Sequence, residues 1–100
     1  VNTLTISNVE VINGGNTNDV VTLGSAVTSG TINLGTGEDS LTLGNFINTV
    51  TLTDVETIIG GSTNDSVTLG SQVTSGTINL AGGSADRLVL GNFANSVTVT

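Results

Sequence analysis

Residues 2–34 read NTLTISNVEVINGGNTNDVVTLGSAVTSGTINL, and residues 48–80 read NTVTLTDVETIIGGSTNDSVTLGSQVTSGTINL. At an offset of 46, 24 of these 33 aligned positions are identical. After one inserted residue the match resumes at an offset of 47, with DSLTLGNF at 39–46 against DRLVLGNF at 86–93. The chain is therefore interpreted as one segment, 1–100, made of repeat 1 (1–47), repeat 2 (48–94) and the start of repeat 3 (95–100).

A weaker half-repeat lies inside each copy, in the form Asp-x-apolar-x-Leu-Gly-polar after a Gly-rich turn. Its leading residues are Asp19, Asp39, Asp65 and Asp86, spaced by 20, 26 and 21. We interpret this as one Asp turn per rung, with rungs alternating between about 21 and about 25 residues. The predicted fold is all-β, a parallel β-solenoid (β-roll or β-helix) of about four rungs.

The segments between these turns have the alternation of apolar and polar residues that is typical of strands. Thr, a β-branched residue that suits strands, occurs 18 times. The segments 9–13 and 55–59 alternate less regularly, which suggests a bend or bulge. Phe46 and Phe93 are expected to fill a wide corner. The alternating apolar residues should point inward and stack on their repeat homologues: Val21, Leu23, Ile32, Leu34, Leu41, Leu43, Val50 and Leu52, with Val67, Leu69, Ile78, Leu80, Leu88, Leu90, Val97 and Val99.

The composition excludes several classes of protein. The net charge is −7, with a single base, Arg87, so the phosphate contacts of a nucleic-acid-binding protein are not expected. The chain has no Cys and no His, which removes disulfides, thiolate metal sites and the commonest catalytic base. No apolar run approaches the ~20 residues that span a membrane.

The four Asp turns are GGNTNDVVT (14–22), LGTGEDSLT (34–42), GGSTNDSVT (60–68) and AGGSADRLV (81–89). They resemble the nine-residue repeat of the repeats-in-toxin (hemolysin-type) calcium-binding family, Gly-Gly-x-Gly-x-Asp-x-apolar-x. The resemblance implies a parallel β-roll with calcium between successive turns, held by Asp carboxylates and turn carbonyls. Carried over residue by residue, it implies these metal-site positions: Asp19, Asp39, Asp65, Asp86, Gly14, Gly15, Gly35, Gly37, Gly60 and Gly61.

The turns depart from the family pattern, and this leaves a second interpretation open. Thr17, Thr63 and Ser84 replace the middle glycine in three of the four turns, and the wide spacing of the Asp turns leaves at most one edge for metal. Asp also forms turns without any ion, by bonding its own backbone. The adjacent pair Glu38–Asp39 has no long loops around it to build a substrate groove, so an enzyme is not expected.

These features predict a structural repeat module of a secreted or cell-surface protein, serving as a fibre, a stalk or an adhesin spacer. No cap is evident at either end, so we expect self-association end to end or continuation in a longer array. Calcium would neutralise the Asp column and couple folding to metal. The alternative function is an ice-binding or other ligand-binding surface made of three outward rows: Thr3, Thr5 and Ser7; Thr49, Thr51 and Thr53; Ser96, Thr98 and Thr100.

Overall fold

The computed structural model describes all residues, 1–100, and contains strands and turns without any helix. The all-β prediction is therefore confirmed. The eleven strands are β1 (Thr3–Ile6), β2 (Val11–Gly15), β3 (Val20–Leu23), β4 (Gly30–Gly35), β5 (Ser40–Thr42), β6 (Asn48–Thr53), β7 (Thr57–Gly61), β8 (Asp65–Leu69), β9 (Gly76–Ala81), β10 (Arg87–Val89) and β11 (Val97–Val99).

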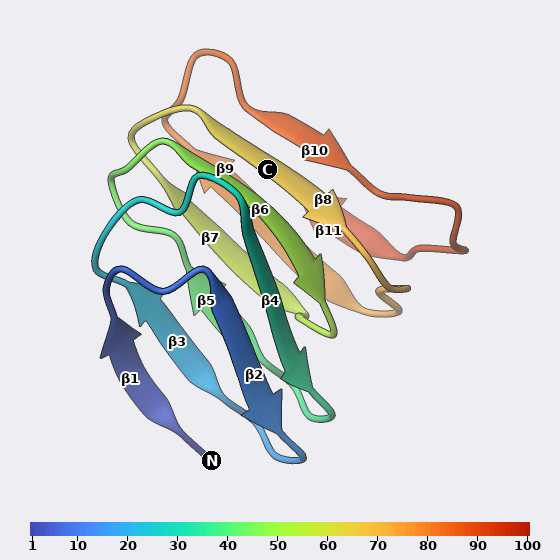
Figure 1. Cartoon of the computed structure of the whole chain (residues 1–100). Helices are drawn as coiled ribbons and strands as arrows, with labels where there is room; N and C mark the ends of the chain where they lie inside the picture. The colour runs from blue at the N-terminus through green and yellow to red at the C-terminus, as the bar shows by residue number, and fades with distance from the viewer.

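The strands form two parallel sheets that face each other, as Figure 1 shows. Sheet A has the order β1-β3-β5-β7-β9-β11, and sheet B has the order β2-β4-β6-β8-β10. Each strand pairs with the strand two positions later in the chain, so one turn of the solenoid contains one strand from each sheet. The predicted parallel β-solenoid is confirmed, with about five turns in place of four.

The rungs are shorter than the Asp spacing suggested. Thr3 pairs with Val20, an offset of 17, Val20 pairs with Ser40, an offset of 20, and Gly76 pairs with Val97, an offset of 21. The predicted alternation of longer rungs was wrong because the irregular segments do not merely bend. They form two complete strands, β2 and β7, which add half a turn to each repeat.

Each sequence repeat therefore contributes five strands, or two and a half turns. Because five is odd, homologous strands lie in opposite sheets: β1 belongs to sheet A, and its homologue β6 belongs to sheet B. The prediction that repeat homologues stack on each other is wrong. Ile32 of sheet B pairs with Ile12 and Leu52, while its homologue Ile78 pairs with Ile58 in sheet A.

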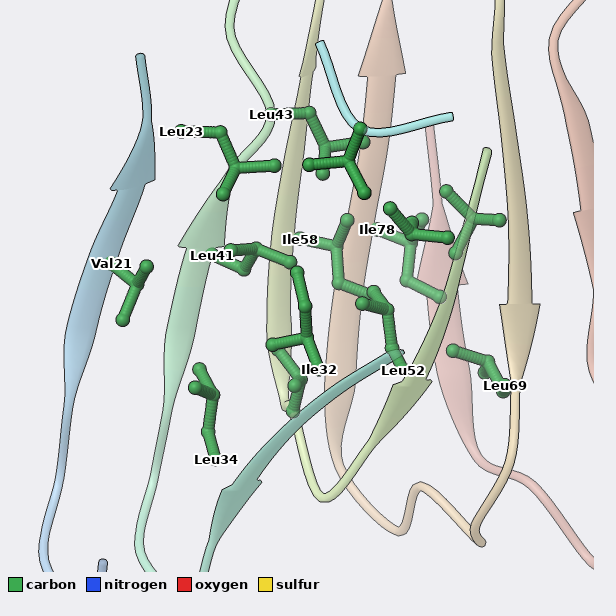
Figure 2. Packing of buried hydrophobic residues seen from close by; sticks show 14 of the residues in the cluster. Val21, Leu23, Ile32, Leu34, Leu41, Leu43, Leu52, Ile58, Leu69 and Ile78 are labelled. Carbon is green, nitrogen blue, oxygen red and sulfur yellow. The ribbon is translucent and has the colours of Figure 1, made fainter. Parts of the chain in front are cut away.

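The core is a single cluster of 17 buried hydrophobic residues between the two sheets (Figure 2). Nearly all the residues predicted to point inward belong to it or pack against it. Val99 is the exception; it is 52% exposed although it pairs with buried Ile78, because no strand follows β11. The predicted corner filling by Phe46 and Phe93 is wrong. The first is half-buried and the second is exposed, and each ring lies over a glycine, Gly44 or Gly91.

Candidate functional site: two carboxylate columns

Polar side chains at the starts of the sheet A strands form a hydrogen-bonded column that we call column A. The backbone N–H of Asn2 donates to Asp19 Oδ1 (2.8 Å). The N–H of Asp19 donates to Asp39 Oδ1 (2.7 Å), and that of Asp39 donates to Glu56 Oε2 (2.8 Å). Each acidic side chain thus accepts the N–H of the residue one rung earlier. This contact satisfies a backbone donor at the point where the parallel ladder begins.

A second column, column B, lies at the starts of the sheet B strands. The N–H of Val27 donates to Asn48 Oδ1 (3.0 Å), and the N–H of Asn48 donates to Asp65 Oδ1 (3.2 Å). The N–H of Asp65 donates to Asp86 Oδ1 (2.9 Å). Because strands of the two sheets run in opposite directions (Figure 1), their starting points, and with them the two columns, lie at opposite edges of the solenoid.

The four predicted Asp ligands are therefore divided between two edges. Asp19 and Asp39 lie in column A, and Asp65 and Asp86 lie in column B. The expectation of a single edge lined by all four is wrong. Its physical cause is the odd number of strands in the repeat, which moves the homologue of every column A residue to the other edge.

The predicted turn glycines lie beside the same columns, where they permit close approach of backbones. A Cβ on Gly14 or Gly60 would overlap the carbonyl oxygen of Leu34 or Leu80. Gly35 and Gly37 have positive φ angles of 88° and 150°, a region that glycine occupies at little cost. The remaining pair is Gly15 and Gly61, which end β2 and β7.

In column A, the neighbouring carboxyls of Asp39 and Glu56 both have raised pKa values. Asp39 is 1% exposed, and its Oδ2 is buried without a hydrogen-bond partner. Burial raises the pKa of the Asp39 carboxyl, and the charges of Asp19 and Asp54 raise it further. Burial also raises the pKa of Glu56, with a further contribution from Asp39. Both side chains line a polar depression of about 580 Å³ together with Glu38.

The first carboxylate of column A has the opposite behaviour. The backbone N–H of Asn2 holds the pKa of Asp19 below its usual value, and the Asn2 side-chain amide and the Gly15 N–H add to this effect. Asn2 Nδ2 donates to Asp19 Oδ1 at 3.0 Å, and Gly15 N donates to Asp19 Oδ2 at 3.2 Å. Asp19, which accepts from Asn2, is thus stabilised as an anion, whereas Asp39, which accepts from Asp19, is not.

Most carboxylate oxygens of the two columns already accept hydrogen bonds. Calcium takes six to eight oxygen ligands, but both oxygens of Asp19 accept hydrogen bonds, as does one oxygen of Asp39 and of Asp65. The turn carbonyls of Gly15 and Gly61 accept N–H groups from Thr36 and Gly82. No group of three or more acidic side chains is close enough to hold an ion. Calcium binding stays a prediction of the family resemblance.

Several column members were not recognised from the sequence. Asn48 is 1% exposed, and its Nδ2 donates to Phe46 O (2.8 Å), Leu43 O (3.3 Å) and Asp65 Oδ1 (3.0 Å). Asn95 repeats this role by accepting from Val73 N (3.0 Å). The signal was present in the sequence, because Asn2, Asn48 and Asn95 occupy one repeat position, directly before a strand.

Column A predicts an unusual dependence of stability on pH. Because folding raises the pKa values of Asp39 and Glu56, these two groups stabilise the folded state fully at low pH. This stabilisation is lost as the pH rises through their folded pKa values, which lie above the ordinary values of 3.8 and 4.5. The contribution of Asp19 is present above 3.8 and is lost as the pH falls further. We expect the melting temperature to be higher near pH 5 than at pH 7.5, and to fall again in stronger acid.

Asp39→Asn should reduce the stability gained on lowering the pH, because only Glu56 would still contribute to it, and should raise stability at neutral pH. The amide can accept from Asp19 N and donate to Glu56, as Asn48 does toward Asp65. A hydrogen bond at the buried position of Asp39 Oδ2 should stabilise the fold by about 1 kcal/mol, which raises the melting temperature by about 4–8 °C. Thermal melts of both proteins at pH 5 and pH 7.5 test this. A variant that is less stable than the parent at pH 7.5 would contradict the assignment.

No family model, curated protein or solved structure matches this chain. None of its segments forms a long apolar helix of the kind that crosses a membrane.

Proposed function

We propose that the chain is a structural module of a rod, which stacks end to end or forms part of a longer array, in a fibre, stalk or adhesin spacer on a secreted or surface protein. Parallel ladders that run along the rod axis would carry mechanical load through backbone hydrogen bonds. The proposal includes no catalytic role.

The observation that carries the proposal is the state of the outermost strands. Within residues 1–100, β1 and β2 pair only with β3 and β4, and β10 and β11 pair only with β8 and β9, so each outermost turn has two strand edges on which a further turn, from a second copy or from a longer array, can stack. Open edges of this kind pair readily with another chain. Apolar surface accompanies them: an open depression of about 410 Å³ at the first turn is lined by seven hydrophobic residues, among them Leu4, Val9 and Val11.

A concentration series tests the proposal. Sedimentation velocity from about 1 µM to about 1 mM should show growth of rods, and electron microscopy should show filaments of constant width. The same series with calcium and with a chelator separates stacking from metal binding: rods that form only with calcium would support the family resemblance as well. A chain that remains monomeric throughout, with and without calcium, would contradict the proposed function.

A second candidate function is ice binding by sheet A. The predicted rows of repeats 1, 2 and 3 do not share one face, because β6 lies in sheet B. Sheet A nevertheless presents two outward files without any charged residue, and the files run through successive strands in register. The first contains Thr3, Val20, Ser40, Thr57, Thr77 and Thr98, and the second contains Thr5, Thr22, Thr42, Ile59 and Asn79.

Thermal hysteresis distinguishes this candidate from a purely structural role. A bulky residue at the centre of the files, Thr42→Tyr, should abolish hysteresis if the files bind ice, whereas Thr51→Tyr on the outer face of sheet B should not. An absence of hysteresis in the unmodified chain would remove the candidate and leave the rod proposal unaffected.

A further inference from the structure

Acidic side chains are concentrated on the edge of the solenoid that carries column A. Five of the eight acidic residues occupy the turns that precede β3, β5 and β7: Asp19, Glu38, Asp39, Asp54 and Glu56. These strands are neighbours in sheet A, so the five acids follow one another along the rod in three consecutive turns. The only basic side chain, that of Arg87, begins β10 at the opposite edge. The carboxylates of the column A edge therefore have no basic partner within residues 1–100.

The polar depression of about 580 Å³ lies in the middle of this acidic edge. Glu38, Asp39 and Glu56 contribute carboxyl groups to it, and no hydrophobic residue lines it. Turns on both sides complete its wall, since Asn18 comes from the preceding turn and Thr74 from the following one. The depression therefore lies on the side of the rod, away from the strand edges on which further turns can stack.

One carboxylate oxygen of the depression lacks a hydrogen-bond donor. Asp39 is 1% exposed; its Oδ1 accepts the N–H of Asp19 (2.7 Å), and its Oδ2 has no partner. The adjacent carboxylate of Glu56 accepts the N–H of Asp39 through Oε2 (2.8 Å). Buried oxygens in folded proteins nearly always have a donor, and one without a donor costs free energy. The depression thus has a place for a donor that the chain itself does not provide.

We propose that the depression binds the guanidinium group of an arginine, in a basic segment of a partner protein that lies along the column A edge. A guanidinium has five N–H donors in one plane, so it can donate to the Asp39 and Glu56 carboxylates at the same time. It is also more weakly hydrated than the ammonium of a lysine. This favours arginine, because a donor that reaches a carboxylate as buried as that of Asp39 must give up its water.

The acids around the depression favour a segment with more than one basic residue over a single cation. The charge of Asp19, in the preceding turn, and that of Asp54, in the same turn as Glu56, both act on Asp39. Successive turns lie about 4.8 Å apart, so neighbouring basic side chains of one segment can each reach a different turn. Such a segment would leave the strand edges free, so its binding is compatible with the stacking proposed above.

Nuclear magnetic resonance titration of the whole chain tests the proposal with blocked tripeptides of arginine, of lysine and of citrulline, the uncharged analogue of arginine. At about 0.15 M salt, attraction to the net charge alone is largely screened. The arginine peptide should bind most tightly and shift the amide signals of Asp39, Glu56 and Thr57. Glu56→Gln keeps an acceptor for Asp39 N but removes one charge, so the arginine peptide should bind about tenfold more weakly.

Glu10→Gln is the matched control, because Glu10 holds the same repeat position as Glu56 but is exposed at the opposite edge. It changes the net charge equally and should alter the affinity by less than about twofold. If circular dichroism shows that Glu56→Gln does not fold, Asp54→Asn takes its place and should also weaken binding, since Asn tolerates the φ of 53° at this position. Equal affinities for the arginine peptide and either other peptide, or equal weakening by Glu56→Gln and Glu10→Gln, would overturn the proposal whether or not rods form.

Discussion

Gly61→Ala is expected to destabilise the isolated chain by about 3 kcal/mol, the upper part of the range for overpacking. The added Cβ would overlap the carbonyl oxygen and carbon of Gly44 and approach Asn45 Cα at 2.9 Å. These are backbone atoms of the neighbouring rung, so no side-chain rotation relieves the overlap. β5 and β7 would have to separate locally. Chemical denaturation measured by circular dichroism gives the free energy of unfolding.

Gly15→Ala is the matched control, because Gly15 holds the same repeat position. Its Cβ would meet nothing, and Gly15 does not have a positive φ. Loss of backbone freedom in the unfolded chain should make the variant as stable as the parent, or more stable by about 0.4–1 kcal/mol. Equal losses of stability for Gly15→Ala and Gly61→Ala would show that glycine is needed for the local turn and not for the close approach of the neighbouring rung.

The contrast between these glycines shows what the repeat can and cannot reveal. Alternation of apolar and polar residues predicted the inner and outer faces correctly, since that pattern depends only on the strand period of two. The number of residues in a rung depends on how long each turn is. A repeat length of 46 or 47 residues is compatible with any whole or half number of turns, and only the recognition of β2 and β7 as strands decides between them.

The same half turn explains why the four predicted Asp ligands do not lie along one edge. The sequence identified Asp19 and Asp65 as equivalent, and their hydrogen bonds are equivalent, since each accepts from an Asn N–H. Equivalence in the repeat does not imply proximity, because the repeats are related by half a rotation about the rod. An acidic residue before a strand was interpreted as a possible ligand, whereas its first role in this fold is to accept a backbone N–H.

The number of hydrogen bonds that a column carboxylate accepts depends on the residue one rung earlier. Where Asn precedes a carboxylate, two donors reach one oxygen, as at Asn48 and Asp65. Between Asp39 and Glu56, one backbone N–H donates across two acidic residues, and burial raises the pKa values of both carboxyls. Column A therefore holds the consecutive acids Asp39 and Glu56 at an electrostatic cost.

Asn48→Asp is expected to destabilise the chain by about 3–5 kcal/mol at pH 7, the cost of an uncompensated buried charge. The substitution removes the amide donors to Phe46 O, Leu43 O and Asp65 Oδ1, and it directs a carboxylate at these three acceptors. Because the pKa of the introduced carboxyl should be raised on folding, the deficit should shrink as the pH falls toward its unfolded value near 3.9. Denaturation at pH 7 and pH 4 measures both effects.

Asn2→Asp provides the control at the homologous position. Asn2 is exposed at the first turn, and its Nδ2 has a single acceptor, Asp19 Oδ1. Water can solvate the new carboxylate at this position, so the free energy of unfolding should fall by only about 1 kcal/mol. Similar losses at the two positions would mean that burial in column B does not determine the energetics. A large loss of stability at Asn48 alone would show that an interior rung does not tolerate Asp where carbonyl oxygens face it, as Phe46 O and Leu43 O face the Asn48 amide.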